Sequence, residues 1–543
     1  MSEVSERSLA RSSAIMAGGT VVSRLLGFLR TALLIGFIGT ALSGDAFDVA
    51  NTLPNQFYLL LAGGVLNAVL VPQITKAATH DDGGHVFVNR LLTLSFALVA
   101  VATVVVTALA PLLVRLFSQG WDSPTIALST AFAFICIPQI LFYGLYTLLG
   151  QVLNARGQFA AYMWAPALAN VVAIGGLLWF AHSYARRPSV TDWTWPMVWI
   201  VAGTATVGVA AQALVLIVPL RRSGFHYRPQ WGFRGVGLGS ASRVAMWTFA
   251  ALAVSQLGFV LTSKVLTRAN DLMTAHHVVG GAGKAAYSGA FLLFMLPHSL
   301  ITLSLVTALF TRMSAAAHAG RTREIVDDLA RGLRMPAVLL VPGTVATVLL
   351  GTQAVHVAFF RNTAPETQAI AHVMIAMMIG VVPFGWLYLI QRVYYAYEDA
   401  RTPFILQIVV TAVATAVNLV ALTVDPVRAG VVVGIGQTVS NLAAAIVGFA
   451  LLRRRLGLLR LRSTVRLYVR LALASAAGAL VCWPLVGWLG SRLPAGRGAS
   501  LVELLLGGTV YLVVAFGVAH LMRVEEVGQL VDPVLRRMRR RTS

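Results

Sequence analysis

Long apolar runs separated by short polar connections follow one another from end to end of this chain. The runs are too long for strands and show no period-2 alternation, so the pattern predicts helices. About 20 apolar residues in helical form cross the roughly 30 Å hydrocarbon core of a bilayer. The fold predicted is an all-α polytopic membrane protein whose fourteen transmembrane helices lie near 14–39, 52–76, 91–116, 127–153, 159–182, 194–220, 242–266, 286–310, 332–352, 368–391, 403–424, 429–452, 467–490 and 499–522.

Composition agrees with this pattern. Of 543 residues, 57% are hydrophobic and only 11% are charged, and the mean hydropathy is +0.77. No polar stretch is long enough for a soluble domain, and the N-terminal MSEVSERSLARSS lacks the apolar core and cleavage site of a removable signal peptide. Both cysteines, Cys136 and Cys482, lie in apolar runs, which predicts buried thiols and argues against a disulfide framework or metal cluster.

The distribution of basic residues predicts the orientation. With the N-terminus inside, thirty Lys and Arg fall in cytoplasmic segments, eight in outer segments and four within spans, which accounts for all 42. Lys and Arg are retained on the cytoplasmic side, so both termini are expected to be cytoplasmic. The net charge of +22 is therefore explained by the membrane, and no nucleic-acid partner is expected.

A faint internal repeat suggests the domain organisation. Leu26-Gly27-Phe28 recurs as Leu257-Gly258-Phe259, and two other short matches have similar offsets. Repeats of this kind are common in transporters. They predict two six-helix lobes, 1–220 and 240–452, followed by two further helices over 466–522. The basic tail 523–543 is either an amphipathic helix on the anionic leaflet or a solvated segment.

Two arginines interrupt the first apolar run, VVSRLLGFLRTALLIGFIG (21–39). A charge near the bilayer centre costs roughly 2.5–3.5 kcal/mol, and neither Arg24 nor Arg30 has an acidic neighbour in the sequence. They are about 120° apart around a helix and about 9 Å apart along it. Both can face a wide aqueous cavity, or Arg24 can reach the cytoplasmic headgroups by snorkelling.

Other polar residues near the spans are weaker candidates for the same cavity. Lys264 either snorkels to the outer surface or adds positive charge to the cavity. Asp45 is a helix cap, a solvated charge or a partner for a cavity arginine. Asn51 and Asn55 bracket Pro54 and either line the cavity or cap a helix.

Several motifs are absent from the sequence. It contains no P-loop, HExxH or GxSxG motif and no cluster of acids for a metal. We therefore expect no cofactor, no metal and no ATP-driven transport.

Three segments carry a family resemblance: SRLLGFLRTALLIGFIGTALSGDAFDVANTLPNQFYLLLAGGVLNAVLVP (23–72), FYGLYTLLGQVLNARGQFAAYMWAPALAN and YYAYEDARTPF. They resemble the MurJ/MviN-type lipid II flippases of the multidrug/oligosaccharidyl-lipid/polysaccharide exporter superfamily, and the second half of the first segment looks actinobacterial. The resemblance implies a V-shaped pair of six-helix lobes around a cationic cavity. It also implies that helices 13 and 14 form a groove for a lipid tail.

Five residues of this chain fall on matching motif positions: Ser23, Arg24, Arg30, Asp45 and Asn55. Four other positions depart from the family's Gram-negative branch, which has an acid, an arginine, an acid and an arginine where this chain has Thr31, Tyr58, Gly63 and Leu292. These replacements leave open which residues contact the headgroup.

Three functions were weighed. The first is a non-enzymatic flippase in the bacterial plasma membrane. It would carry lipid II, an undecaprenyl-diphosphate-linked disaccharide pentapeptide, to the outer leaflet by alternating access, with arginines binding the diphosphate. Membrane lipids and the cell-wall synthesis machinery are its further candidate partners. The second is a flippase for another polyprenyl-diphosphate glycan or a multidrug-type exporter. The third is an intramembrane glycosyltransferase using Asp45 and Asp48, which an Asp48→Asn change would inactivate.

Overall fold

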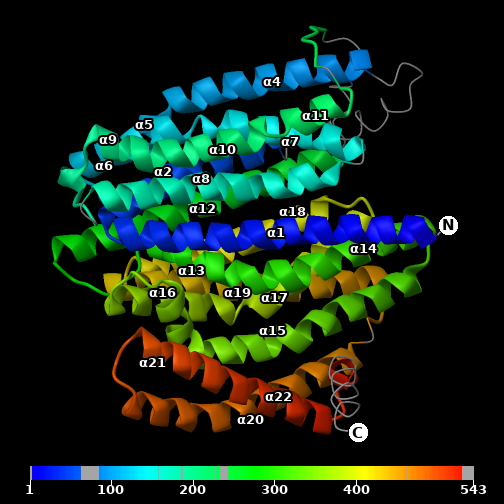
Figure 1. The fold of residues 1–543 in the computed structure, drawn as a ribbon. Helices are drawn as coiled ribbons and strands as arrows, with labels where there is room; N and C mark the ends of the chain where they lie inside the picture. Colours follow the sequence, from blue (N-terminus) through cyan, green and yellow to red (C-terminus); the bar gives the residue numbers. More distant parts are fainter. Residues whose placement is uncertain are drawn as a thin grey trace. The chain divides into compact units, whose positions relative to one another are not determined.

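A computed structural model describes residues 3–62, 85–156, 158–184, 187–225, 227–232, 243–459 and 461–528 (Figure 1). All regular secondary structure in these ranges is helical, which confirms the predicted fold class. The predictions for Gly63, for the inner part of the 52–76 run and for the end of the basic tail lie outside the described residues.

Twelve described helices are long and apolar enough to cross a membrane. A thirteenth span results if α16 (Ala364–Met378) and α17 (Val381–Ala396), which meet at a bend of 46°, count as one broken span. The predicted second span is described only as α2 (Leu42–Leu61). The chain is therefore a multi-pass membrane protein, and the count of fourteen stays a prediction.

The chain divides into two compact units. The first comprises Met1–His276 with Gly283–Ala285, and the second comprises His277–Ala282 with Ala286–Ser543.

The helices of the first unit follow the predicted apolar runs. They are α1 (Glu3–Ile38), α2 (Leu42–Leu61), α4 (His85–Ala108), α5 (Ala110–Phe117), α6 (Ser123–Cys136), α7 (Gln139–Ala155), α8 (Phe159–Ser183), η2 (Val190–Asp192), α9 (Trp195–Val198), the π-helix η3 (Trp199–Gly203), α10 (Thr204–Leu214), α11 (Ile217–Arg222) and α12 (Arg243–Ala275).

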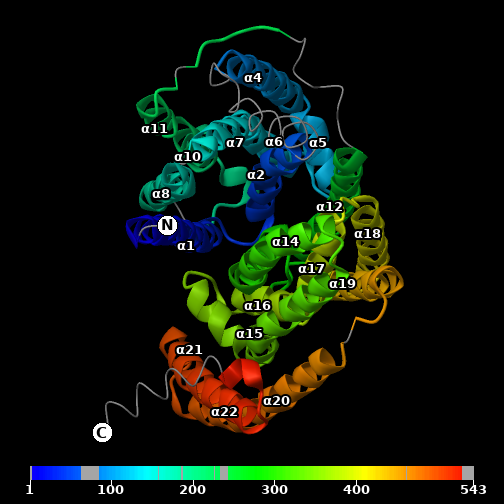
Figure 2. The ribbon, with the colours of Figure 1, turned by 90° about the vertical axis from the view of Figure 1, so that its right-hand side faces the viewer.

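Within this unit α1 lies along α8, and α10 packs on the other side of α8 (Figures 1 and 2). The corner between α1 and α2 is tight: Gly39 has a φ of +90°, and a Cβ on Gly44 would collide with the carbonyl oxygen of Gly39. Only glycine satisfies both demands without strain. The ring of Trp193 packs against Phe132 and Phe180, with centroid distances of 5.0 and 5.6 Å, and these contacts anchor the connection between α8 and α9.

The second unit contains the remaining helices. They are α13 (Lys284–Pro297), the π-helix η5 (His298–Thr302), α14 (Leu303–His318), α15 (Thr322–Ala358), α16, α17, α18 (Arg401–Ala421), α19 (Pro426–Leu456), α20 (Arg462–Arg492), α21 (Arg497–Val502), the π-helix η6 (Glu503–Gly507) and α22 (Gly508–Leu521). The first two residues of α13 group with the first unit.

A chain of hydrogen bonds links three helices of the second unit. The indole of Trp386 on α17 donates to the hydroxyl of Tyr468 on α20 at 2.7 Å, and that hydroxyl donates to the carbonyl of Leu333 on α15 at 2.8 Å. α20 and α22 pack against each other and against α15 (Figure 2). Cys136 and Cys482 are free and buried, as predicted, and lie in different units.

Candidate functional site

The surface of α1 has two distinct sides around the arginines. Val21, Leu25 and Leu29, spaced four residues apart, are 44%, 63% and 38% exposed and form an apolar stripe. Arg24 and Arg30 lie about 100° and 140° around the helix from Leu25, and both are half-buried. The two guanidinium groups are therefore attached away from the exposed apolar stripe.

α8 packs against the face of α1 that lies between the two arginines. A Cβ on Gly27 would be 3.5 Å from the amide nitrogen of Asn170, and that amide donates to the carbonyl of Ser23 at 3.0 Å. Arg24 and Arg30 each lie about 60° around the helix from Gly27. Ser23, a predicted site residue, thus binds α8 through its backbone.

Neither arginine has a carboxylate partner in the described part of the chain, whereas Asp48, near the corner between α1 and α2, forms an ion pair with Lys284. The Arg30 guanidinium lies within electrostatic range of the phenol of Tyr143 on α7. Desolvated, unpaired cations are costly, so these groups are suited to an anionic ligand.

Four tyrosines, Tyr58, Tyr143, Tyr146 and Tyr162, form what we call the tyrosine cluster, and Tyr143 is the member within electrostatic range of Arg30. Tyr58 on α2 is hydrogen-bonded to Thr147 on α7, and the ring centroids of Tyr58 and Tyr143 are 5.6 Å apart. Tyr146 stacks on Tyr162 of α8 with centroids 4.6 Å apart. None of these tyrosines is among the site residues predicted from the sequence, although the three-residue spacing of Tyr143 and Tyr146 within an apolar run is a usable signal.

The predicted asparagines lie on the same side of α2 as Tyr58, since Asn51, Asn55 and Tyr58 are four and three residues apart. Asn51 is half-buried and Asn55 is exposed. Gln56, on another side of α2, accepts a hydrogen bond of 3.0 Å from the amide of Gln256 on α12. The side of α2 that carries Asn51 and Asn55 therefore takes no part in the hydrogen bond between Gln56 and Gln256.

Asp45 has a structural environment that the sequence did not reveal. Its carboxylate is 0% exposed and accepts hydrogen bonds from the Asn270 amide at 2.8 Å and from the backbone N–H groups of Lys284 at 3.0 Å and Ala285 at 2.7 Å. It therefore caps the start of α13, 239 residues away in the sequence. The alternative of a solvated charge is wrong for Asp45, its observed contacts are structural, and a contact with substrate stays a prediction.

The neighbouring Asp48 is paired as well. Its carboxylate forms an ion pair of 2.8 Å with the ammonium of Lys284, which is 2% exposed and lies 5.0 Å from the centroid of the Phe259 ring. Lys284 is one of the eight basic residues in the predicted outer segments, but its side chain is buried because it pairs with Asp48 and packs on Phe259. Both acids of the enzyme hypothesis are thus engaged in structural contacts.

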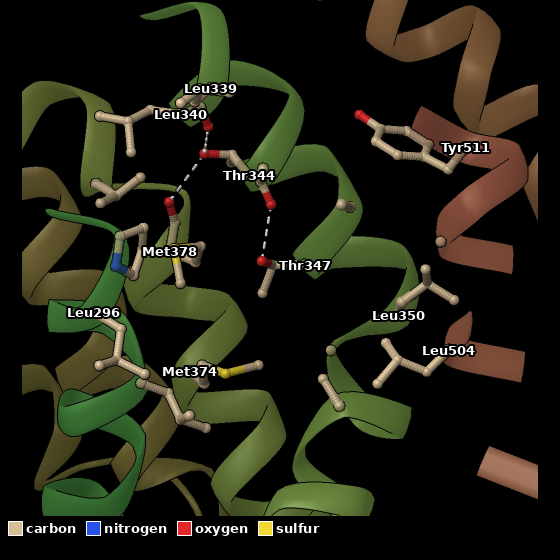
Figure 3. A pocket seen from close by; sticks show the side chains of 18 of the residues that line it. Leu296, Leu339, Leu340, Thr344, Thr347, Leu350, Met374, Met378, Leu504 and Tyr511 are labelled. Carbon is tan, nitrogen blue, oxygen red and sulfur yellow. Dashed lines mark hydrogen bonds between the residues drawn. The ribbon is translucent and has the colours of Figure 1, made fainter. Parts of the chain in front are cut away.

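The second unit contains an apolar pocket of about 380 Å³ (Figure 3). Its lining comes from α13, α15, α16, the start of α17, η6 and α22: Leu293, Leu296, Pro297, Leu339, Leu340, Gly343, Thr344, Ala346, Thr347, Leu350, Gly351, Ala354, Met374, Met378, Val381, Leu504, Gly508, Tyr511 and Leu512. The last span contributes to it, and α20 does not.

The hydroxyl groups around this apolar pocket are used internally. Thr344 donates to the carbonyl of Leu340 at 2.8 Å, and Thr347 donates to that of Gly343 at 2.8 Å (Figure 3). Tyr511 donates to the carbonyl of Pro342 at 2.8 Å. Each of these hydroxyl groups donates its proton to a backbone carbonyl oxygen. The surface left for a ligand is therefore almost entirely hydrocarbon.

Comparison with protein families decides the relationship. A family model described as "Lipid II flippase MurJ" matches residues 35–494. The chain belongs to this family.

Relatives agree along nearly the whole chain. The "Probable lipid II flippase MurJ" of Rhizobium meliloti (strain 1021) is 26% identical over 526 residues, covering 94% of each chain. That of Vibrio cholerae serotype O1 is 26% identical over 543 residues, covering 96% of each. The MurJ family consists of transporters, so the enzyme hypothesis is set aside. The actinobacterial branch stays a prediction.

Solved structures show the same fold. "Lipid II flippase MurJ, inward closed conformation" aligns with a TM-score of 0.70 at 18% identity, covering 92% of this chain and 98% of that chain. An inward-facing multidrug resistance MATE family transporter of the MOP superfamily aligns with a TM-score of 0.58 at 17% identity, covering 81% and 96%.

The positions at which this MurJ-family chain departs from the Gram-negative pattern have local explanations. The hydroxyl of Thr31 donates to the carbonyl of Gly27 at 3.1 Å, so its hydrogen-bond partner lies within α1. Tyr58 joins the tyrosine cluster, whereas Leu292 on α13 is half-buried.

Lys264 on α12, a predicted cavity residue, is half-buried. Among the described residues, no hydrogen bond or ion pair involves its side chain, and none links it to Arg24 or Arg30.

Proposed function

We propose that this chain moves lipid II from the cytoplasmic to the outer leaflet of the bacterial plasma membrane by alternating access, without covalent chemistry. Both termini lie in the cytoplasm in this proposal, and two six-helix lobes, 1–220 and 240–452, alternate around the headgroup. The enzymes that polymerise the delivered disaccharide would be its functional partners.

The observation that carries the proposal is the pair of guanidinium groups on α1. Arg24 and Arg30 lie away from the exposed apolar stripe and have no carboxylate partner among the described residues. A diphosphate would supply the missing negative charge through charge-assisted hydrogen bonds, which arginine can make in bidentate form. Without such a ligand, two unpaired cations within a span would be a net cost.

The apolar pocket of the second unit supports the same substrate. A polyprenyl chain needs a hydrocarbon surface, and this lining offers one because its hydroxyl groups are bonded internally. We assign the pocket to part of the lipid tail, with Leu504, Gly508 and Tyr511 of the last span on one wall. Of the two helices predicted to form the 466–522 groove, the second thus lines the pocket and α20 does not.

A MATE-like exporter is the less favoured alternative. A carrier of organic cations needs unpaired acids within its spans, and here Asp45 and Asp48 are engaged by Asn270, Lys284 and Ala285. Asp45 and Asp48 are therefore not available to an organic cation, and the two unpaired charges of α1, Arg24 and Arg30, suit an anionic cargo.

The test is lipid II flipping in proteoliposomes. Hydrogen bonds to charged groups contribute about 1.5–3 kcal/mol each, so the double variant Arg24→Ala, Arg30→Ala should lower the flipping rate by about 100-fold or more. Arg115→Ala, at the exposed end of α5, is the matched control and should flip normally. A double variant that is folded and flips at the unaltered rate would refute the proposal.

A further inference from the structure

α7 has a polar stripe where a lipid-facing helix would be apolar. Gln139, Tyr143, Tyr146 and Thr147 lie within about 100° of one another around the helix. Polar groups at this depth are costly unless protein or water receives them. At one end of the stripe Gln139 is buried, and its amide donates to Thr206 of α10 at 3.0 Å. The three hydroxylated residues Tyr143, Tyr146 and Thr147 form the half-buried remainder of the stripe.

Every hydroxyl of this stripe has a protein partner. Tyr143 donates to the Gln139 side-chain oxygen at 3.3 Å, and Tyr146 donates to the carbonyl of Tyr162 at 2.9 Å. Thr147 bonds to Tyr58. These bonds fix the orientation of the rings before any ligand arrives, which lowers the entropic cost of binding.

The four rings of the tyrosine cluster are nevertheless only half-buried. A buried structural aromatic cluster would place its rings out of reach of solvent and ligand. These rings combine a fixed orientation with accessible aromatic surface, at a site where Arg30 supplies positive charge beside Tyr143.

Sugar rings fit this combination of features. One face of a pyranose carries C–H bonds that pack on an aromatic ring, and its hydroxyl groups can hydrogen-bond to phenols at the edge. Tyr143 and Tyr146 are three residues apart, about 4.5 Å along α7, which is about the width of one pyranose. We propose that the tyrosine cluster is a sugar-binding platform for the pyranose that is attached directly to the diphosphate.

This inference rests on the proposed function, because it takes Arg30 as the diphosphate-binding residue. The two can be tested apart by comparing two ligands. Lipid II carries the sugars and the diphosphate, whereas undecaprenyl diphosphate carries only the diphosphate. A sugar platform affects the first ligand alone, and a diphosphate site affects both.

The experiment measures the dissociation constants of both ligands for the full-length protein in nanodiscs. Aromatic contacts contribute about 0.5–1.5 kcal/mol beyond area burial, so Tyr146→Leu should weaken lipid II binding about two- to tenfold and leave undecaprenyl diphosphate binding unchanged. Tyr146→Phe keeps the ring and should retain most of the affinity. Trp179→Leu removes a 58% exposed ring from α8 and is the matched control.

Each other outcome overturns one of the two proposals. If Tyr146→Leu weakens both ligands equally, the ring is structural, and if it weakens neither, the platform does not exist. If Arg30→Ala leaves undecaprenyl diphosphate binding intact, the proposed function fails, whatever the tyrosine variants do. Should Tyr146→Leu not purify as a folded protein, Tyr143→Leu gives the same test at the neighbouring ring.

Discussion

The tyrosine cluster of the first unit and the apolar pocket of the second use the same residue types in opposite ways. In the apolar pocket, Thr347 and Tyr511 donate to backbone oxygens and leave only hydrocarbon to a ligand. In the tyrosine cluster, Thr147 and Tyr58 bond to each other instead of to the backbone, and Tyr143 lies within electrostatic range of Arg30, which has no carboxylate partner in the described residues. Side-chain type alone therefore does not define a polar surface, because the choice of partner decides what remains for a ligand.

This difference matches a cargo with two chemistries. A polyprenyl-diphosphate glycan has a charged, hydroxylated head and a long hydrocarbon tail, and no single surface suits both. Because the two surfaces are separate, a substitution in the tyrosine cluster should alter recognition of the head without affecting the tail. A substitution in the apolar pocket should do the reverse.

The largest effect is expected at Asp45. Its buried carboxylate holds the fold together, whereas the tyrosine cluster is proposed to bind ligand. Asp45→Asn removes a charged acceptor from Asn270, Lys284 and Ala285, at a cost of about 3 kcal/mol or more. Both the unfolding temperature of the purified protein and its flipping rate should fall. Asp425→Asn, whose amide oxygen can still accept the exposed hydrogen bond that the Val427 N–H donates, should cost about 1 kcal/mol or less. Equal unfolding temperatures would contradict the structural role of Asp45.

A smaller, selective effect is expected from filling the apolar pocket. A Cβ on Gly343 meets nothing within 4 Å, so Gly343→Leu should occupy the pocket without strain. Displacing one or two buried methylenes costs about 0.8 kcal/mol each, which predicts a flipping rate about fivefold lower for full-length lipid II. A short-chain analogue should be unaffected.

Gly517 on α22 is the control for that experiment, since its Cβ would also meet nothing within 4 Å and it lies outside the pocket lining. Gly517→Leu should leave both substrates unaffected. If Gly343→Leu slows long-chain and short-chain lipids equally, the pocket does not hold the tail.

The smallest effects come from one substitution made in both regions. Thr147→Val leaves the Tyr58 hydroxyl without its partner, so about 0.5–1 kcal/mol is lost and flipping should slow about two- to fivefold. Thr347→Val removes only a bond to the Gly343 carbonyl, and its flipping rate should stay within about twofold. Initial rates in proteoliposomes check both, and a Thr347 variant slower than the Thr147 variant would invert the comparison.

The helical fold and the two arginines could be predicted because their signals are local. Apolar run lengths place the spans, and Arg24 and Arg30 stand out against their own neighbours. The apolar stripe of Val21, Leu25 and Leu29 then shows which side of α1 the arginines avoid.

The roles of Asp45 and Lys284 could not be predicted because their partners are remote. The hydrogen bonds that Asp45 accepts from α12 and α13 span 225–240 residues. The sequence places Lys284 in a loop and does not reveal that it pairs with Asp48. The apolar pocket likewise assembles residues from Leu293 to Leu512. Such sites arise from packing between helices that no local pattern connects.

Cys136 and Cys482, the only two cysteines of the sequence, are both 0% exposed. A maleimide reagent therefore has no native thiol to attack in the folded protein. Spectroscopic labels can be attached to cysteines introduced at chosen positions without first removing the native ones. Distances between such labels in the two units would follow a transport cycle directly.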